Sequence, residues 1–93
     1  MVIGLMELGI HIPYSHSLKE KRKTMNIIKD RIGKRYNVAF AELDHHDKWQ
    51  RIKIGFVTLN NSKNLVEKML NNIALDIEQV VEGEIFEKDI HFI

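Results

Sequence analysis

Residues 2–20 read VIGLMELGIHIPYSHSLKE, and they contain a change from the two-residue period of a strand to the first turn of a helix. Over residues 6–12 every second residue is apolar, which predicts a half-buried strand over residues 2–12 that ends at Pro13. Ser17 and Glu20 form a capping box, in which the serine hydroxyl accepts from the Glu20 amide and the carboxylate reaches back to the Ser17 amide. A helix is therefore predicted to begin at this serine.

The rest of the chain repeats this change between strand and helix patterns. A narrow apolar stripe carries the first helix to about Arg35, and its members are Leu18, Met25, Ile28, Ile32 and Tyr36. Strand patterns cover residues 38–43, 49–59 and 85–93, and apolar residues three and four apart predict a second helix over residues 62–81, capped by Asn61 or Ser62. The order βαββαβ predicts a ferredoxin-like α+β sandwich over residues 1–93, a four-stranded antiparallel sheet with two helices on one face.

The composition is that of one ordinary globular domain. The 93 residues are 44% hydrophobic and 29% charged, enough for a single core. The absence of cysteine excludes disulfides, thiolate metal sites and a cysteine nucleophile, and it favours a reducing compartment. The first residues carry no basic leader, and no apolar run approaches the ~20 residues of a membrane span. We expect a cytoplasmic protein that does not insert into membranes.

The net charge of +1 conceals an uneven distribution along the chain. Residues 1–55 carry eleven Lys and Arg against six Asp and Glu, whereas residues 56–93 carry three against seven. Such an asymmetry can steer the basic side toward a polyanion, or it can pair the two halves of neighbouring molecules. The composition alone does not distinguish polyanion binding from pairing between molecules.

The first predicted helix concentrates the positive charge, because eight Lys and Arg face only Glu20 and Asp30. This surface is either a polyanion site or a solvated helix face. The topology brings the helix start and the hairpin at residues 44–48 to one end, where free helix amides and cations attract anions and an aromatic ring can stack on a base. The candidate anion- or RNA-binding residues are Lys19, Lys21, Arg22, Lys23, Trp49 and Arg51.

The sheet face that the helices leave open is the second candidate surface. Strand alternation places an apolar set on it, Ile3, Leu5, Val57, Leu59 and Ile85. A monomer rarely leaves such a patch bare, so this face predicts a homodimer. An RRM-type platform needs aromatic residues on both central strands, and the strand over residues 2–12 offers Ile3, Leu5, Glu7, Gly9 and His11 instead, which disfavours RNA binding on the sheet.

Metal binding and catalysis have little support in the sequence. The segment Asp44-His45-His46-Asp47 resembles a metal-ligand cluster, but neighbouring strand residues point to opposite faces, and a hairpin with Asp side chains bonded to its turn explains it. His16 and Ser17 come near this segment, yet Ser17 is explained as a helix cap and no nucleophile elbow accompanies it. The glycines stand singly, so no phosphate-binding loop is present. We expect no metal, no cofactor and no enzyme.

Three motifs carry a resemblance to a known family: SLKEKR at residues 17–22, RYNV at 35–38 and ELDHHDKWQR at 42–51. In this order and spacing they resemble the YlxP-like family, domain of unknown function 503, over essentially the whole chain. The sequence departs from that pattern at His46, where glutamine is usual, and at Lys48, where an apolar residue is usual. The family is uncharacterised, and its members are often encoded near translation-initiation and ribosome-maturation factors, which implies a link to RNA or the ribosome.

These observations lead to two functional expectations. The first is a non-catalytic adaptor that engages RNA or a ribosomal particle through the basic helix and the loops at residues 13–17 and 44–51. The alternative is a homodimeric structural or protein-interaction module with no nucleic-acid role.

Overall fold

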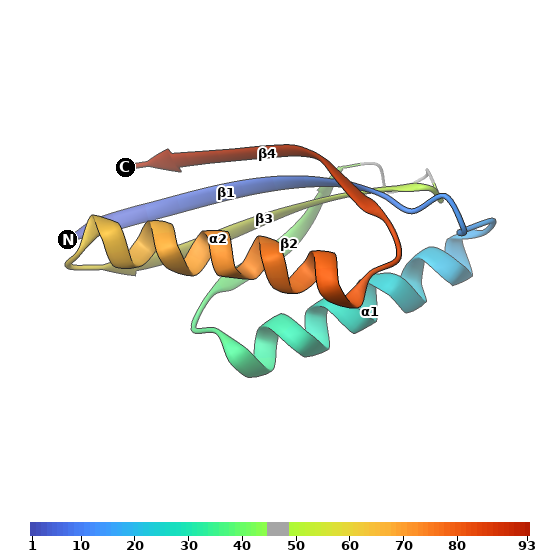
Figure 1. Ribbon diagram of the computed structural model, residues 1–93, viewed down its shortest axis with the longest axis horizontal. Helices are drawn as coiled ribbons and strands as arrows, with labels where there is room; N and C mark the ends of the chain where they lie inside the picture. Colours follow the sequence, from blue (N-terminus) through green and yellow to red (C-terminus); the bar gives the residue numbers. More distant parts are fainter. Residues whose placement is uncertain (45–48) are drawn as a thin grey trace.

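The computed structural model describes residues 1–44 and 49–93, and its elements follow the predicted order (Figure 1). The strands pair antiparallel in one sheet with the order β2-β3-β1-β4, so the predicted ferredoxin-like fold is confirmed. The elements are β1 Val2–His11, α1 Leu18–Arg35, β2 Ala39–Asp44, β3 Arg51–Asn60, α2 Lys63–Val80 and β4 Glu84–Phe92.

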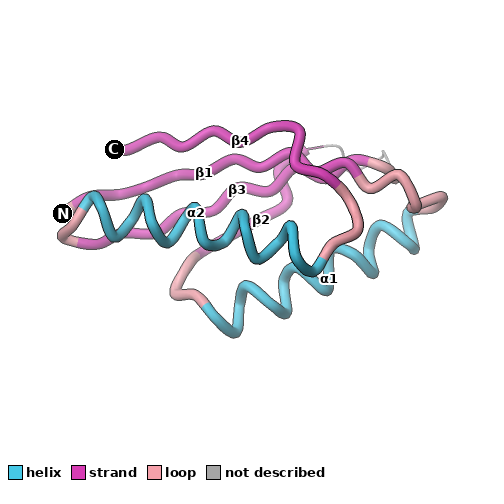
Figure 2. Tube along the Cα trace, viewed as in Figure 1, coloured by secondary structure: helices cyan, strands magenta, loops and turns pink. Residues whose placement is uncertain are grey.

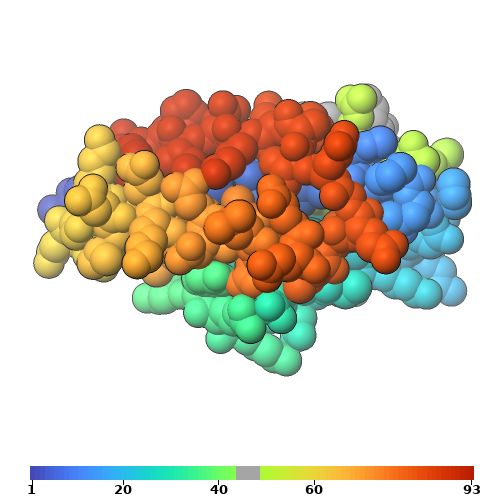
Figure 3. Space-filling view, viewed as in Figure 1, coloured from blue at the N-terminus to red at the C-terminus, as the bar shows by residue number. Residues whose placement is uncertain are grey.

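Both helices lie on the same side of the sheet and leave its other face open (Figure 2). In the space-filling view α2, in yellow and orange, lies between β4 in red and α1 in cyan and green (Figure 3). The core fills the space between the helices and the two central strands. Its fully buried large side chains are Met6, Leu8, Ile10, Ile12, Ile28, Ile32, Ile52, Ile54, Phe56, Leu70, Ile73 and Ile77.

A serine side chain caps the N-terminus of each helix. Ser17 Oγ accepts from the Glu20 amide at 3.1 Å, as the capping box predicts. The Glu20 carboxylate reaches one residue further than expected and accepts from the His16 amide at 2.6 Å. At the start of α2, Ser62 Oγ accepts from the Leu65 amide at 3.3 Å. Each helix therefore begins where its cap serine predicts.

The buried face of α1 is more polar than its apolar stripe predicts. Leu18, expected in the stripe, is 43% exposed, whereas Lys21 and Thr24 are buried. Thr24 Oγ1 lies 2.9 Å from the Tyr14 hydroxyl, and Lys21 pairs with Glu42 of β2. Polar side chains can be buried here because each has a polar partner from another part of the chain.

The register of β4 differs from the predicted alternation. A shift in the β1–β4 pairing pairs Gly9 with Glu87 but Ile10 with Ile85, so the bulge adds one residue to β4. Ile85 consequently packs against the core. Phe86 instead lies on the open face, beside Gly9 and 47% exposed. The assignment of Ile85 to the open face was wrong, because strand alternation alone takes no account of a bulge.

Candidate functional site

The structure divides the eight cationic side chains of α1 into two groups. Lys19, Arg22, Lys23 and Lys29 are exposed and make no ion pair with any described side chain, those of residues 1–43 and 49–93. At 100° per residue these four cover about a third of the helix circumference. The other four form ion pairs with three acids, Lys21–Glu42 at 3.8 Å, Arg31–Asp76 at 3.1 Å, Arg35–Asp76 at 3.2 Å and Lys34–Asp30 at 3.0 Å.

Lys21 does not belong to the exposed anion-binding set in which the sequence placed it. The residue is only 3% exposed, and its Nζ lies 3.8 Å from the Glu42 carboxylate. The side chain leaves α1 on the core side, so its methylene stem is buried and its ammonium reaches the inner face of β2. The prediction for Lys21 is therefore corrected.

Arg51 points away from α1. It pairs with His11, and because the adjacent Ile10 and Ile52 are buried under the helices, Arg51 faces the open side of the sheet. Its guanidinium carbon lies 5.5 Å from the centre of the Phe86 ring, a cation–π contact. The predicted cluster of Arg51 with the cations of α1 does not form.

Trp49 precedes β3 and is 49% exposed, so its ring is available for stacking. The side chain of Asp44 and the whole of residues 45–48 lie outside the described part of the protein. The prediction of a polar hairpin tip, the alternative of a metal cluster and the family departures at His46 and Lys48 all fall on these positions.

The first turn of α1 carries its own negatively charged group, the carboxylate of Glu20. The Ser17 hydroxyl accepts a hydrogen bond from the Glu20 amide. The Glu20 carboxylate accepts one from the amide of His16, which lies just before the helix. A carboxylate at this position complements the helix dipole in the way that a bound phosphate would. Of the unpaired cations of α1, Lys19, Arg22 and Lys23 lie in its first two turns on the exposed side, while this cap satisfies the amides of His16 and Glu20.

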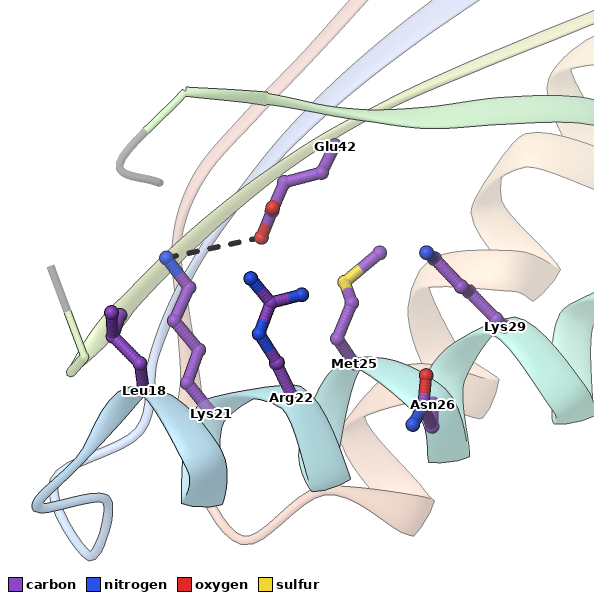
Figure 4. Close-up of a pocket in the computed structure, with 7 residues that line it drawn as sticks. All are labelled: Leu18, Lys21, Arg22, Met25, Asn26, Lys29 and Glu42. Atoms are coloured by element: carbon purple, nitrogen blue, oxygen red, sulfur yellow. Dashed lines mark ion pairs between the residues drawn. The ribbon is translucent and has the colours of Figure 1, made fainter. Parts of the chain in front are cut away.

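A cavity of about 160 Å³ lies between α1 and β2 (Figure 4). Arg22 and Lys29 rise from α1 toward β2 on either side of Met25, and Lys21 meets Glu42 beside them. The sequence analysis did not single out Lys29 or Glu42 as site residues. The lining residues are Leu18, Lys21, Arg22, Met25, Asn26, Lys29 and Glu42.

A hydrogen-bonded cluster ties the end of α1 to α2. Asp76 is buried and accepts from Arg31 at 3.1 Å, from Arg35 at 3.2 Å and from the Tyr36 hydroxyl at 2.6 Å. The Tyr36 hydrogen bond and the two guanidinium groups hold the pKa of Asp76 below its ordinary value. Burial and the bond to Asp76 raise the pKa of Tyr36. This cluster holds the guanidinium groups of Arg31 and Arg35 against one carboxylate, although both side chains remain partly exposed.

The open sheet face keeps four of its five predicted apolar residues. Ile3 pairs with Leu59 and Leu5 pairs with Val57, and all four project from the face without helices. Leu59 is 60% exposed and Val57 is 41% exposed. Further small and apolar residues from β2 extend the patch, namely Ala39, Ala41 and Leu43.

Comparisons with known proteins agree with the motifs in the sequence. The family described as "Protein of unknown function (DUF503)" matches residues 3–90. The chain belongs to the DUF503 family. This DUF503 protein is 32% identical over 83 residues to the uncharacterised protein YlxP of Bacillus subtilis (strain 168). The aligned region covers 89% of this chain and 90% of YlxP. The resemblance to the YlxP-like family is thereby confirmed.

A solved structure also shares the DUF503 fold. The structural-genomics protein YJCS has a TM-score of 0.62 to this chain and covers 96% of both chains, at 11% identity, which supports the fold alone. Neither its name nor that of YlxP states a function, so the roles of the site residues rest on their geometry. Within the described residues, no helix is long and apolar enough to cross a membrane.

Proposed function

We propose that this DUF503 protein is a non-catalytic RNA-binding protein that contacts the phosphate backbone through the exposed cations of α1. The observation that carries the proposal is the division of charge on this helix. Three acidic side chains pair with four of its cations, while Lys19, Arg22, Lys23 and Lys29 stay exposed without an acidic partner in the described structure. Residues 19–29 extend about 15 Å along the helix axis, long enough to contact successive phosphates.

The chemistry of these residues supports backbone contacts without base recognition. Lys and Arg contacts to phosphates position a protein on a nucleic acid and carry no sequence information by themselves. Trp49, half exposed before β3, can add stacking with an unpaired base. Ser17 serves as a helix cap, so its hydroxyl supports a structural role and not that of a nucleophile. A ribosomal particle is one RNA partner with these properties, in line with what the family resemblance implies.

The test is the salt dependence of RNA binding, measured by fluorescence anisotropy with labelled oligouridine. Each lost phosphate contact lowers the slope of log affinity against log salt by about 0.7 for a single strand. The variant Lys19→Ala/Lys23→Ala should therefore bind more weakly and lose about 1.4 units of slope. The matched control Lys63→Ala/Lys68→Ala removes the same charge from α2 and should retain the parent slope.

The outcome against the proposal is equally specific. Circular dichroism must first show that both variants keep the fold. Parent-like affinity and slope in Lys19→Ala/Lys23→Ala, or an equal loss in the α2 control, would mean that α1 is a solvated surface with no RNA-binding role.

A second candidate function, homodimerisation, rests on the open sheet face. Leu59 and Val57 are exposed beside Ile3 and Leu5, and a contiguous apolar patch of this kind usually has a partner. The two functions are compatible because α1 lies on the opposite side of the sheet. Sedimentation should show a dimer that Leu59→Glu converts to a monomer, whereas Leu75→Glu on α2, a leucine of similar exposure, leaves it intact. A parent monomer at roughly tens of micromolar would refute this candidate.

A further inference from the structure

The outer edge of β2 is open over most of its length. β2 stands first in the sheet order, so its outer backbone groups have no strand partner among the described residues. Proteins guard such edges with charged side chains, proline or bulges. Residues 39–43 contain no Lys, Arg or Pro, and the two protections of β2, the inward-pointing Glu42 and the bulge between Glu42 and Asp44, both lie at one end of the strand. The other edge, β4, is guarded by a bulge and by Glu87, Lys88 and Asp89.

The cavity between α1 and β2 adjoins this edge, because Glu42 of β2 is part of its lining. Its volume of about 160 Å³ equals that of about five water molecules. Sites for whole small molecules usually have about 300–1,000 Å³. The cavity is therefore large enough for one side group of a longer ligand, and the edge of β2 offers backbone hydrogen bonds to the rest of that ligand.

The charge of the cavity selects acidic groups. Three of its lining residues are cationic and one is acidic, and the ion pair with Lys21 engages that one acid, Glu42. Arg22 and Lys29 are exposed, lack ion pairs in the described structure and point toward β2 (Figure 4). Seven helical residues separate them by about 10 Å along the axis. Side chains two or four apart on one face of a strand are about 7 or 13 Å apart, within reach of two such flexible cations.

We propose that the edge of β2 and the adjoining cavity bind an extended acidic segment of a partner protein, which joins the sheet as an additional strand. Its backbone would pair with residues 39–43, and Asp or Glu side chains on its inner face would meet Arg22 and Lys29. In this binding mode the main-chain hydrogen bonds supply affinity and the pockets for alternate side chains supply specificity.

Two other occupants fit the surface less well. A second copy pairing through its own β2 would bring two α1 helices together, each with unpaired Arg22 and Lys29, and like charges repel. RNA would meet the same cations but has no peptide backbone to pair with β2. The inference shares Arg22 and Lys29 with the proposed RNA binding, but Lys19 and Lys23 lie outside the cavity, so variants at those two residues test RNA binding by itself.

The test begins with a displayed library of random linear peptides selected on the unaltered protein. The enriched peptides should carry Asp or Glu at alternate positions. Charge reversal in Arg22→Glu/Lys29→Glu should weaken their binding about 100-fold, about tenfold for each reversed contact. The matched control Lys19→Glu/Lys23→Glu should bind them as the parent does. Peptides whose acidic residues are changed to Lys should bind the Arg22→Glu/Lys29→Glu variant. Such binding requires a folded variant, so it separates the loss of charge attraction from misfolding.

Backbone amide NMR of the unaltered protein locates the contact without any variant. Addition of an enriched peptide should shift the amides of residues 39–43 and leave those of residues 84–92 in place. The proposal fails if no peptide is enriched, if the enriched peptides lack acidic alternation, or if the shifts lie elsewhere. It also fails if oligouridine shifts the amide signals of residues 39–43 in the same way, since the cavity would then be a binding site for RNA. Loss of RNA binding in the Lys19 and Lys23 variants bears only on the proposed function.

Discussion

Replacement of Asp76 by asparagine tests whether the cluster between the helices stabilises the fold. Asp76→Asn keeps the size of the side chain but removes the charge that holds Arg31, Arg35 and the Tyr36 hydroxyl. A broken buried ion pair costs about 3–5 kcal/mol. The side chains of Arg31 and Arg35 are 34% and 52% exposed, so water replaces part of what they lose. We expect a loss of about 2 kcal/mol in the free energy of unfolding.

The assay is urea denaturation, with Asp30→Asn as the control. Asp30 pairs with Lys34 on the exposed side of α1, and its loss should cost less than about 0.5 kcal/mol. Because the folded pKa of Asp76 is depressed, its contribution is complete above the ordinary value of 3.8 and is lost as the pH falls through the lower folded value. The difference between parent and Asp76→Asn should therefore be constant from neutral pH to about pH 5 and shrink below about pH 4.

Either of two results would refute this reasoning. One is a loss at neutral pH no larger than that of the Asp30→Asn control. The other is a difference between parent and variant that stays constant to the lowest pH at which both proteins fold, since the charge of Asp76 would then contribute nothing.

Three further predictions concern single positions. Ser17→Ala should lower the free energy of unfolding by about 1 kcal/mol and leave RNA binding unchanged; loss of binding at parent stability would make Ser17 a functional residue. Gly83→Ala should cost about 2 kcal/mol, because the added methyl group overlaps the carbonyl oxygen of His11, whereas Gly33→Ala, with nothing nearer than 3.9 Å, should stabilise α1 by about 1 kcal/mol in the same denaturation assay. Tyr36 contributes stability below pH 10 that is lost as the pH rises through its raised pKa, so the advantage of the parent over Tyr36→Phe should disappear in alkaline urea titrations; an advantage that persists there contradicts the assignment.

The fold was predictable because its signals are local. The alternation in β1 and the hydroxyl of Ser17 depend on neighbours a few residues away, and both take the predicted form. Ile85 shows where such reasoning stops: its face depends on a bulge in the pairing of β4 with β1, two strands far apart in the chain. A period-2 pattern contains no information about that pairing.

The candidate site also combines features set by local sequence with features set by contacts distant in the chain. The sequence by itself determined the element order and the concentration of cations on α1. Only the tertiary structure decided which of those cations are available, because the acids that neutralise Lys21, Arg31 and Arg35 come from β2 and α2. It likewise turned Arg51 to the opposite face and placed Glu42 beside Arg22. Charge density is a property of the local sequence, but the neutralisation of each charge depends on contacts between residues distant in the chain.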